Sequence, residues 1–186
     1  MDRFSNKKRS SGVLLHISSL PGPYGIGEIG NEAKAFVNDL AMMNQKYWQI
    51  LPTNYPERHN SPYDTNSAFA QNPLLISLDG LIEDGLLSES ELKPIPEFIK
   101  SRVEFEKLKK WKQILLKKAA ANFSNADNND LTKYHEFCTE QGFWLNDYAI
   151  FMVLKEMQDQ ADWSYWELKY RKFNENNIDD IKFINK

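Results

Sequence analysis

The sequence has one cysteine, little net charge and no long apolar run. The single cysteine, Cys138, excludes an internal disulfide and fits a reducing compartment, so we expect a cytoplasmic protein. A net charge of −3 over 186 residues provides no global field that would attract nucleic acid or an anionic membrane. The apolar runs are far too short to span a bilayer, and residues 1–11 are not followed by the apolar stretch of a secretory signal. We therefore expect no nucleic-acid partner and no membrane association.

Histidine is also scarce, and familiar catalytic motifs are missing. His16, His59 and His135 do not have the spacing of metal ligands and have no nucleophile nearby in the sequence. The sequence contains no Ser/His/Asp set, no Walker loop and no cysteine pair. We expect neither a metal nor a cofactor.

The first part of the chain has the pattern of a strand, a helix and a second strand. Val13–Ser18 is a short apolar run that predicts a buried strand, and Tyr47–Leu51 predicts another one stopped by Pro52. Asn31 is expected to cap the helix between them. The helical stripe consists of Ala33, Phe36, Val37, Leu40 and Ala41. This order predicts a βαβ unit with parallel strands and a right-handed crossover.

Glycine becomes rare after Ser88, where only Gly142 remains, and the helical period takes over. We therefore expect two domains, 1–87 and 88–186. Before this boundary, Leu74–Leu78 is a third short apolar segment, and Leu81–Leu87 begins a helical region. Beyond it we expect helices over 98–122, 131–141 and 144–158, and a short turn opened by Trp163 and Trp166. The first of these helices is expected to bury Leu108, Trp111, Leu115 and Ala119, preceded by Val103, while Gly142 is expected to close the second.

The segment Asn60–Pro73, with the sequence NSPYDTNSAFAQNP, is the candidate binding loop. Asp64 is its one charged residue, and hydroxyl and amide side chains lie between the rings of Tyr63 and Phe69. Pro62 stiffens the backbone, so Tyr63 is presented from a fixed position. An aromatic ring beside hydroxyls and amides suits a sugar, because the ring covers the C–H face and the polar groups bond the hydroxyls. Composition alone also fits an ordinary polar loop anchored by two rings.

Two further patterns have competing interpretations. Gly25, Gly27 and Gly30 form a G-x-G-x-x-G motif between strand and helix, which would suit a dinucleotide. Residues 19–24 separate the motif from its strand, and no acidic residue follows the second strand, so glycines that relieve a tight loop are the better interpretation. The basic residues of 100–118 could form a helix for membranes or RNA, but a solvated helix face is favoured.

Four stretches together resemble the 4-alpha-glucanotransferases (amylomaltases, or disproportionating enzymes) of the alpha-amylase superfamily. They are SGVLLHISSLPGPYGIGEIG, YWQILP, SPYDTNSAFAQNPLLISL and FWLNDYAIFMVLKE with Trp163 and Trp166 behind it, in family order. The resemblance implies an α/β fold: the N-terminal part of a TIM (β/α)8 barrel, with its first βαβ unit, and a mostly α-helical insertion. It also implies that Ser61 and Tyr63 contact the glucan beside the scissile bond.

The resemblance implies a retaining transfer between α-1,4-glucans, with maltooligosaccharides or starch-like glucans as substrates. No residue of this chain matches the family's catalytic carboxylates, so we assign no catalytic residue and expect a barrel fragment that is inactive without the remainder of the barrel. Arg58, His59 and Asn60 stand where the family favours Gly-Asp, and Gln71 where it favours glycine. The alternatives are a non-catalytic glucan-binding or scaffold protein and a nucleotide-binding βαβ protein.

Overall fold

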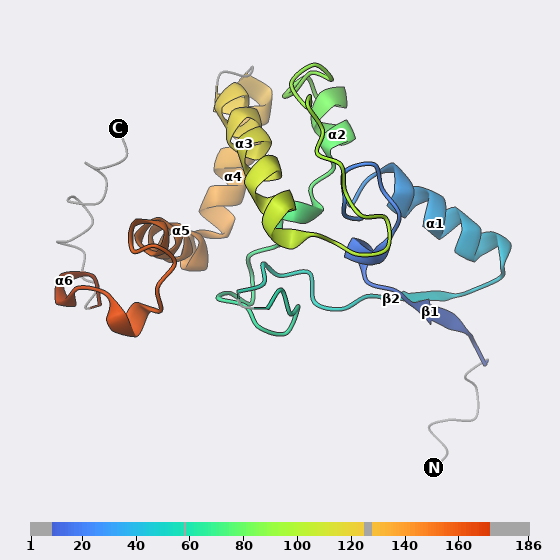
Figure 1. The fold of residues 1–186 in the computed structure, drawn as a ribbon, viewed down its shortest axis with the longest axis horizontal. Helices are drawn as coiled ribbons and strands as arrows, with labels where there is room; N and C mark the ends of the chain where they lie inside the picture. The colour runs from blue at the N-terminus through green and yellow to red at the C-terminus, as the bar shows by residue number, and fades with distance from the viewer. Residues whose placement is uncertain (1–8, 58, 125–127, 172–186) are drawn as a thin grey trace, which may run out of the picture. The chain divides into compact units, whose positions relative to one another are not determined.

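The computed structural model describes residues 9–57, 59–124 and 128–171, and it opens with the predicted βαβ unit. Strand β1 (Gly12–Leu14) pairs in parallel with β2 (Tyr47–Gln49), with Val13 opposite Trp48. Helix α1 (Asn31–Met42) lies between them in the chain (Figure 1). The parallel pairing of the two predicted strands is confirmed, and the fold is α/β.

Both strands are shorter and less buried than the sequence predicts. Ile17 and Ser18, expected at the end of the first strand, lie instead in a 3-10 turn, η1 (Ile17–Ser19). Among the described residues, α1 covers one face of the β1–β2 pair, where Phe36 contacts Trp48 edge-on with ring centroids 5.0 Å apart. Leu14, on the other face, is 58% exposed. The prediction of a buried strand is therefore wrong for β1.

Helix α1 begins without the predicted cap. Gly30 occupies the N-cap position and Asn31 is the first helical residue, so Asn31 does not cap the helix. Of the predicted stripe, Leu40 is buried, whereas Val37 is 49% exposed. The inward side of α1 is thus narrower than the apolar pattern suggested.

The third apolar segment folds into turns and a short helix. Pro73–Leu75 form a 3-10 turn, η2, which Asn72 caps by accepting a hydrogen bond from the Leu74 N–H. Ile76 then makes a parallel bridge to Ile29. Helix α2 (Leu78–Glu83) follows, capped by Ser77, and so begins before the predicted Leu81.

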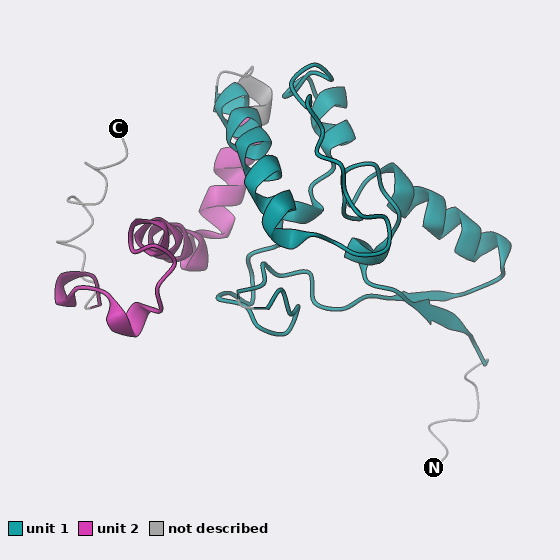
Figure 2. Ribbon diagram, in the orientation of Figure 1, with its two compact units in different colours: residues 1–128 teal, residues 129–186 magenta. Residues whose placement is uncertain are grey.

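Helix α3 (Phe105–Ser124) starts later than predicted and belongs to the N-terminal unit. The chain divides into two compact units, Met1–Asn128 and Asn129–Lys186 (Figure 2), so the division lies well after the composition change at Ser88. The division falls after α3 because this helix packs against the N-terminal elements. Leu108 of α3 joins one buried cluster with Ile17 and Leu74, while other α3 residues join a second cluster. The predicted inward residues Leu108, Leu115 and Ala119 are buried, as expected, with Trp111 partly buried.

The C-terminal unit consists mainly of α4 (Asn128–Glu140) and α5 (Gly142–Met157), followed by η3 (Trp163–Tyr165) and α6 (Leu168–Arg171). Gly142 is the first residue of α5 and not the residue that closes the preceding helix. The core of this unit is built on Leu154 and Trp166. Cys138 is a free, half-buried thiol on α4. Among the described residues, no helix combines the length and apolarity needed to cross a bilayer.

Candidate functional site

The candidate loop is an irregular hairpin that follows β2. Backbone bridges pair Asn54 with Gln71 and Pro56 with Thr65 in antiparallel fashion. The Asn72 N–H donates to the Thr53 carbonyl at 2.8 Å, which closes the base. The Thr53 hydroxyl also donates to the Gln71 side-chain oxygen, so Gln71, which stands where the family favours glycine, helps to hold this base.

Short polar side chains hold the interior of the hairpin. Ser67 Oγ accepts hydrogen bonds from the Phe69 and Ala70 N–H groups, each at 3.1 Å. The Thr65 hydroxyl donates to the Ser67 carbonyl at 3.0 Å and accepts from its N–H. Bonds of this kind replace a regular ladder and fix a turn-rich backbone. Thr65 and Ser67 therefore have a structural role in this segment.

The two predicted glucan-contacting residues lie in one tight turn of the hairpin. The Ser61 carbonyl oxygen accepts a hydrogen bond from the Asp64 N–H at 3.1 Å. Ser61 Oγ accepts another from the Tyr63 N–H at 3.4 Å. The Tyr63 side chain is 73% exposed, so its ring is available to a ligand. Because Ser61 Oγ is used as an acceptor here, its own hydrogen can be donated outward. The structure thus brings Ser61 and Tyr63 together.

The turn is entered through two residues in the left-handed region. His59 and Asn60 both have φ of 54°, which glycine adopts more readily than other residues. This explains in physical terms why a glycine suits this place in the family pattern. Asn60 Oδ1 is also buried without a hydrogen-bond partner among the described atoms. Such strain and unpaired polarity are common at ligand-contacting turns. Arg58 lies outside the described residues.

The start of the hairpin is braced against α3. The ring of Tyr55 lies beneath the ammonium of Lys109, with Nζ 5.9 Å from the ring centroid. Burial raises the pKa of the Tyr55 phenol, and the nearby negative charge of Glu106 adds to this effect. Tyr55 is therefore held in its neutral form, packed under α3.

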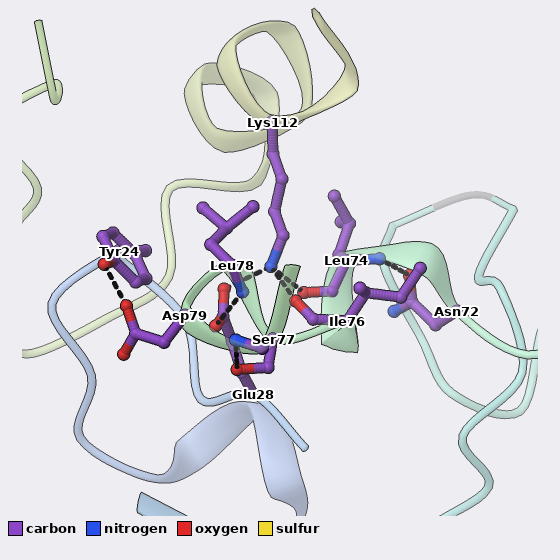
Figure 3. Close-up of polar contacts among 10 residues, drawn as sticks. Tyr24, Glu28, Asn72, Leu74, Ile76, Ser77, Leu78, Asp79 and Lys112 are labelled. Carbon is purple, nitrogen blue, oxygen red and sulfur yellow. Dashed lines mark hydrogen bonds and ion pairs between the residues drawn. The ribbon is translucent and has the colours of Figure 1, made fainter. Parts of the chain in front are cut away.

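The end of the hairpin is held by a buried lysine of α3. Lys112 is fully buried, and its Nζ donates to the carbonyls of Leu74 at 2.8 Å and Ile76 at 2.7 Å (Figure 3). Its third partner is the Glu28 carboxylate, which also accepts from the Leu78 N–H at 2.9 Å. This set of contacts, which we term the Lys112 clamp, joins Glu28, α3 and residues 74–78.

The charges of the clamp are opposed by their own burial. Burial raises the pKa of the Glu28 carboxyl, and Lys112 and the Leu78 N–H act in the other direction. Burial likewise lowers the pKa of the Lys112 ammonium, and Glu28 opposes that shift. Each charge is thus tolerated in the interior because the other is present.

The sequence contained a signal for this clamp that the basic-helix interpretation missed. Lys112 was predicted to lie on a solvated face of α3, which is wrong. Its position, four residues after Leu108 and three before Leu115, places it within the apolar stripe of the helix. A charge at such a position requires a buried partner, and Glu28 supplies it.

The glycines of the G-x-G-x-x-G motif are used for packing. Gly25 has φ of 79° and lies against the Phe98 ring, while a Cβ on Gly27 would stand 2.0 Å from the Ile17 carbonyl oxygen. A Cβ on Gly30 would stand 2.5 Å from Ser77 Oγ. The space that a pyrophosphate would need beside these glycines is occupied by protein atoms. Close packing therefore accounts for all three glycines of the motif.

No metal centre is formed by the part of the chain that the structure describes, since no three His, Cys, Asp or Glu side chains converge there. His16 lies after β1 with Nδ1 buried and unpaired among the described atoms, and burial lowers its pKa. His16 is therefore neutral at physiological pH.

The fold and the site together define an α/β protein with a preorganised, ring-bearing polar loop beyond the carboxyl end of a parallel strand. The sequence model of the 4-alpha-glucanotransferase family matches residues 15–185. The chain belongs to this family.

Relatives and a solved structure agree with this assignment. The chain is 44% identical over 161 residues to the 4-alpha-glucanotransferase of Synechocystis sp., covering 86% of this chain and 32% of that protein. It is 38% identical over 175 residues to that of Thermus thermophilus, covering 94% and 34%. The amylomaltase of Streptococcus agalactiae, solved in complex with acarbose, matches with a TM-score of 0.88 at 34% identity, covering 94% of this chain and 35% of that one. The chain thus spans about a third of the length of these relatives.

Proposed function

We propose that this chain provides the first glucan-contacting part of a 4-alpha-glucanotransferase acting on maltooligosaccharides or starch-like α-1,4-glucans. The observation that carries the proposal is the turn that presents the exposed Tyr63 ring beside the Ser61 hydroxyl. The ring would cover the apolar face of a glucose unit, and Ser61 would bond a sugar hydroxyl. The acarbose bound by the Streptococcus agalactiae relative supports a ligand of this class.

We further propose that β1 and β2 are the first two strands of a TIM barrel. Support comes from their parallel pairing and from the exposed apolar residues Leu14 and Tyr47, 58% and 65% exposed, on the uncovered face of the pair. Further strands would cover this face and pair the open edges. The remainder of the barrel is the partner that this surface fits.

The reaction proposed for the whole enzyme is a retaining double displacement. One carboxylate forms a glucosyl-enzyme, a second acts as acid and then base, and the 4-hydroxyl of another glucan takes the place of water. Asp64 is the one carboxylate between Asn60 and Pro73, whereas the reaction needs two. In this proposal Ser61 and Tyr63 orient the sugar, and the carboxylates come from elsewhere in the barrel. The free thiol of Cys138 supports a reducing compartment, which we propose to be the cytoplasm.

Binding by the loop alone is expected to be weak. Covering one aromatic side chain contributes on the order of 2 kcal/mol. Such a free energy corresponds to a dissociation constant of about 30 mM, and the entropy cost of association weakens the binding further. The full set of subsites would add contacts and raise the affinity.

An NMR titration of the chain with maltotriose, and separately with NAD, tests the proposal. Maltotriose is expected to shift the amide signals of residues 61–69, and Tyr63→Ala is expected to abolish these shifts. Phe69→Ala, which removes the other exposed ring of the loop, is the matched control. Shifts at Gly25–Gly30 with NAD, or no response of the loop to maltotriose, would contradict the proposal.

A further inference from the structure

A pocket of about 390 Å³ lies within the C-terminal unit, and its lining residues come from α5, from η3 and Trp166, and from α6. Its lining combines two indoles, a phenyl ring and a phenol with the charged groups of Asp147 and Arg171. This volume is in the range of small-molecule sites. We propose that this pocket binds a neutral sugar ring, at a site separate from the Asn60–Pro73 loop.

The floor of the pocket is rigid. Trp166 is 3% exposed, and its Nε1–H donates to the Ala161 carbonyl at 2.9 Å. Phe151 lies beside it, with ring centroids 5.4 Å apart and the planes tilted by 33°. Leu154, 2% exposed, completes the apolar floor. These side chains are already ordered in the folded protein, so a ligand that binds here loses little free energy to fixing them.

The rim carries an exposed indole in a fixed position. Trp163 is the first residue of η3 and is 56% exposed. Asp162 caps this turn, accepting from the Ser164 N–H at 3.0 Å and from the Ser164 hydroxyl at 2.8 Å. The Trp163 Nε1–H has no hydrogen-bond partner among the described residues. It is therefore available to a ligand hydroxyl, while its ring face is available for stacking.

The charged side chains complete the polar part of the rim. Arg171 Nε donates to the Trp166 carbonyl at 2.7 Å, which holds the guanidinium beside the floor and leaves its terminal nitrogens as donors. Asp147 lines the same pocket from α5 and makes no ion pair with Arg171 within the described part of the chain. The pocket thus offers one acceptor group and one donor group above an aromatic floor.

The aromatic and charged side chains that line the pocket favour one class of ligand over the others. An apolar segment of protein would bury the Asp147 and Arg171 charges without partners, which is costly. A phosphate ester would face the Asp147 carboxylate, and an organic cation would face the Arg171 guanidinium. A sugar ring satisfies both, because its C–H face stacks on the indole and its hydroxyls both donate and accept. That the sugar is an α-1,4-glucan rests on the proposed function.

The test is a titration of the full chain with maltoheptaose, followed by ¹H–¹⁵N NMR at the tryptophan indole N–H signals. The Trp163 signal is expected to shift and saturate at millimolar sugar, both in the wild type and in Tyr63→Ala. Asp147→Asn is expected to weaken this response several-fold, and Trp163→Ala to abolish sugar-induced shifts elsewhere around the pocket. Trp144, whose Nε1–H is bonded to the Gln141 side chain at 2.8 Å outside the pocket, provides the unaffected reference signal. Far-UV circular dichroism checks that each variant is folded.

The same spectra separate this inference from the proposed function. Shifts at residues 61–69 without a shift of Trp163 would overturn the pocket and keep the proposed function. A Trp163 response without the loop response would support the pocket and contradict the role of the loop. An equal Trp163 response to cellohexaose would overturn the assignment to α-1,4-glucan. Trp163 shifts on protein dilution, with no response to sugar, would show a self-association surface and overturn the pocket.

Discussion

The Lys112 clamp allows a quantitative test of how the candidate loop is held. Lys112→Met keeps the length of the side chain but removes the ammonium, so the buried Glu28 carboxylate loses its counter-charge and the carbonyls of Leu74 and Ile76 lose a donor. Removing one partner of a buried ion pair costs about 3–5 kcal/mol of unfolding free energy. For a chain of this size, that corresponds to a melting temperature lower by roughly 6–20 °C.

The double variant distinguishes the pair from its single members. Glu28→Gln with Lys112→Met leaves no buried charge, and the amide oxygen at position 28 can still accept from the Leu78 N–H. We therefore expect the double variant to be more stable than Lys112→Met alone, with a coupling free energy of about 2 kcal/mol or more. The matched control is Lys110→Met on the exposed side of the same helix, for which we expect almost no change.

The assay is urea unfolding followed by circular dichroism and tryptophan fluorescence. Two results would refute the reasoning: a Lys112→Met variant that unfolds like Lys110→Met, or a double variant whose loss equals the sum of the two single losses. The maltotriose titration on Lys112→Met, at a temperature where it is folded, also shows whether the clamp positions the loop. We expect weaker shifts at residues 61–69 than in the wild type.

Three further predictions follow from the site and its surroundings. The chain alone is expected not to disproportionate maltotriose, because none of its residues matches the family's catalytic carboxylates; glucose and longer maltodextrins above a heat-killed control in chromatography would contradict this. Gly27→Ala is expected to prevent stable folding because its Cβ would stand 2.0 Å from the Ile17 carbonyl oxygen, whereas Gly142→Ala, which meets nothing within 4 Å, is expected to melt like the wild type. The Lys118 side chain and the Ser88 N–H lower the pKa of Glu91 from 4.5 to about 2, so its stabilising contribution is present above pH 4.5 and lost as the pH falls toward 2. Melting curves of the wild type and Glu91→Gln should therefore converge toward pH 2, and a constant difference over pH 2–7 would argue against the ion pair.

The sequence pattern predicted the elements that depend on local periodicity. The inward side of α3 was correctly predicted at Leu108, Leu115 and Ala119, because a helix that packs along its length repeats its apolar residues at helical spacing. The parallel β1–β2 pair was also predicted, since a strand, a helix and a strand of these lengths have few other arrangements.

Other features depended on tertiary contacts that periodicity does not encode. Leu74–Leu78 has the composition of a strand, yet Pro73 and the Asn72 cap turn it into η2. The Glu28–Lys112 pair joins residues far apart in the sequence, and only the place of Lys112 in an apolar stripe hints at it.

The candidate loop was predicted from the sequence in part: its residues were identified, but its backbone conformation was not. Ser61 and Tyr63 were identified by resemblance, and their proximity in the structure follows from the turn closed by the Asp64 N–H. Their contact with glucan remains a prediction. His and Asn enter the left-handed region more often than most residues other than glycine, but they also adopt other conformations freely, so the residue types did not predict the positive φ that the hairpin imposes on His59 and Asn60.

The most direct test of the central claim is whether the Tyr63 ring touches the face of a glucose unit. Selective saturation of the aromatic protons, with detection of the maltotriose C–H protons by saturation-transfer difference NMR, measures this contact at millimolar sugar. The account predicts transfer to the sugar C–H protons in both the wild type and Trp163→Ala, and a marked loss of transfer when Trp163→Ala also carries Tyr63→Ala. Equal transfer in Trp163→Ala with and without Tyr63→Ala would contradict the claim that this loop is the glucan site.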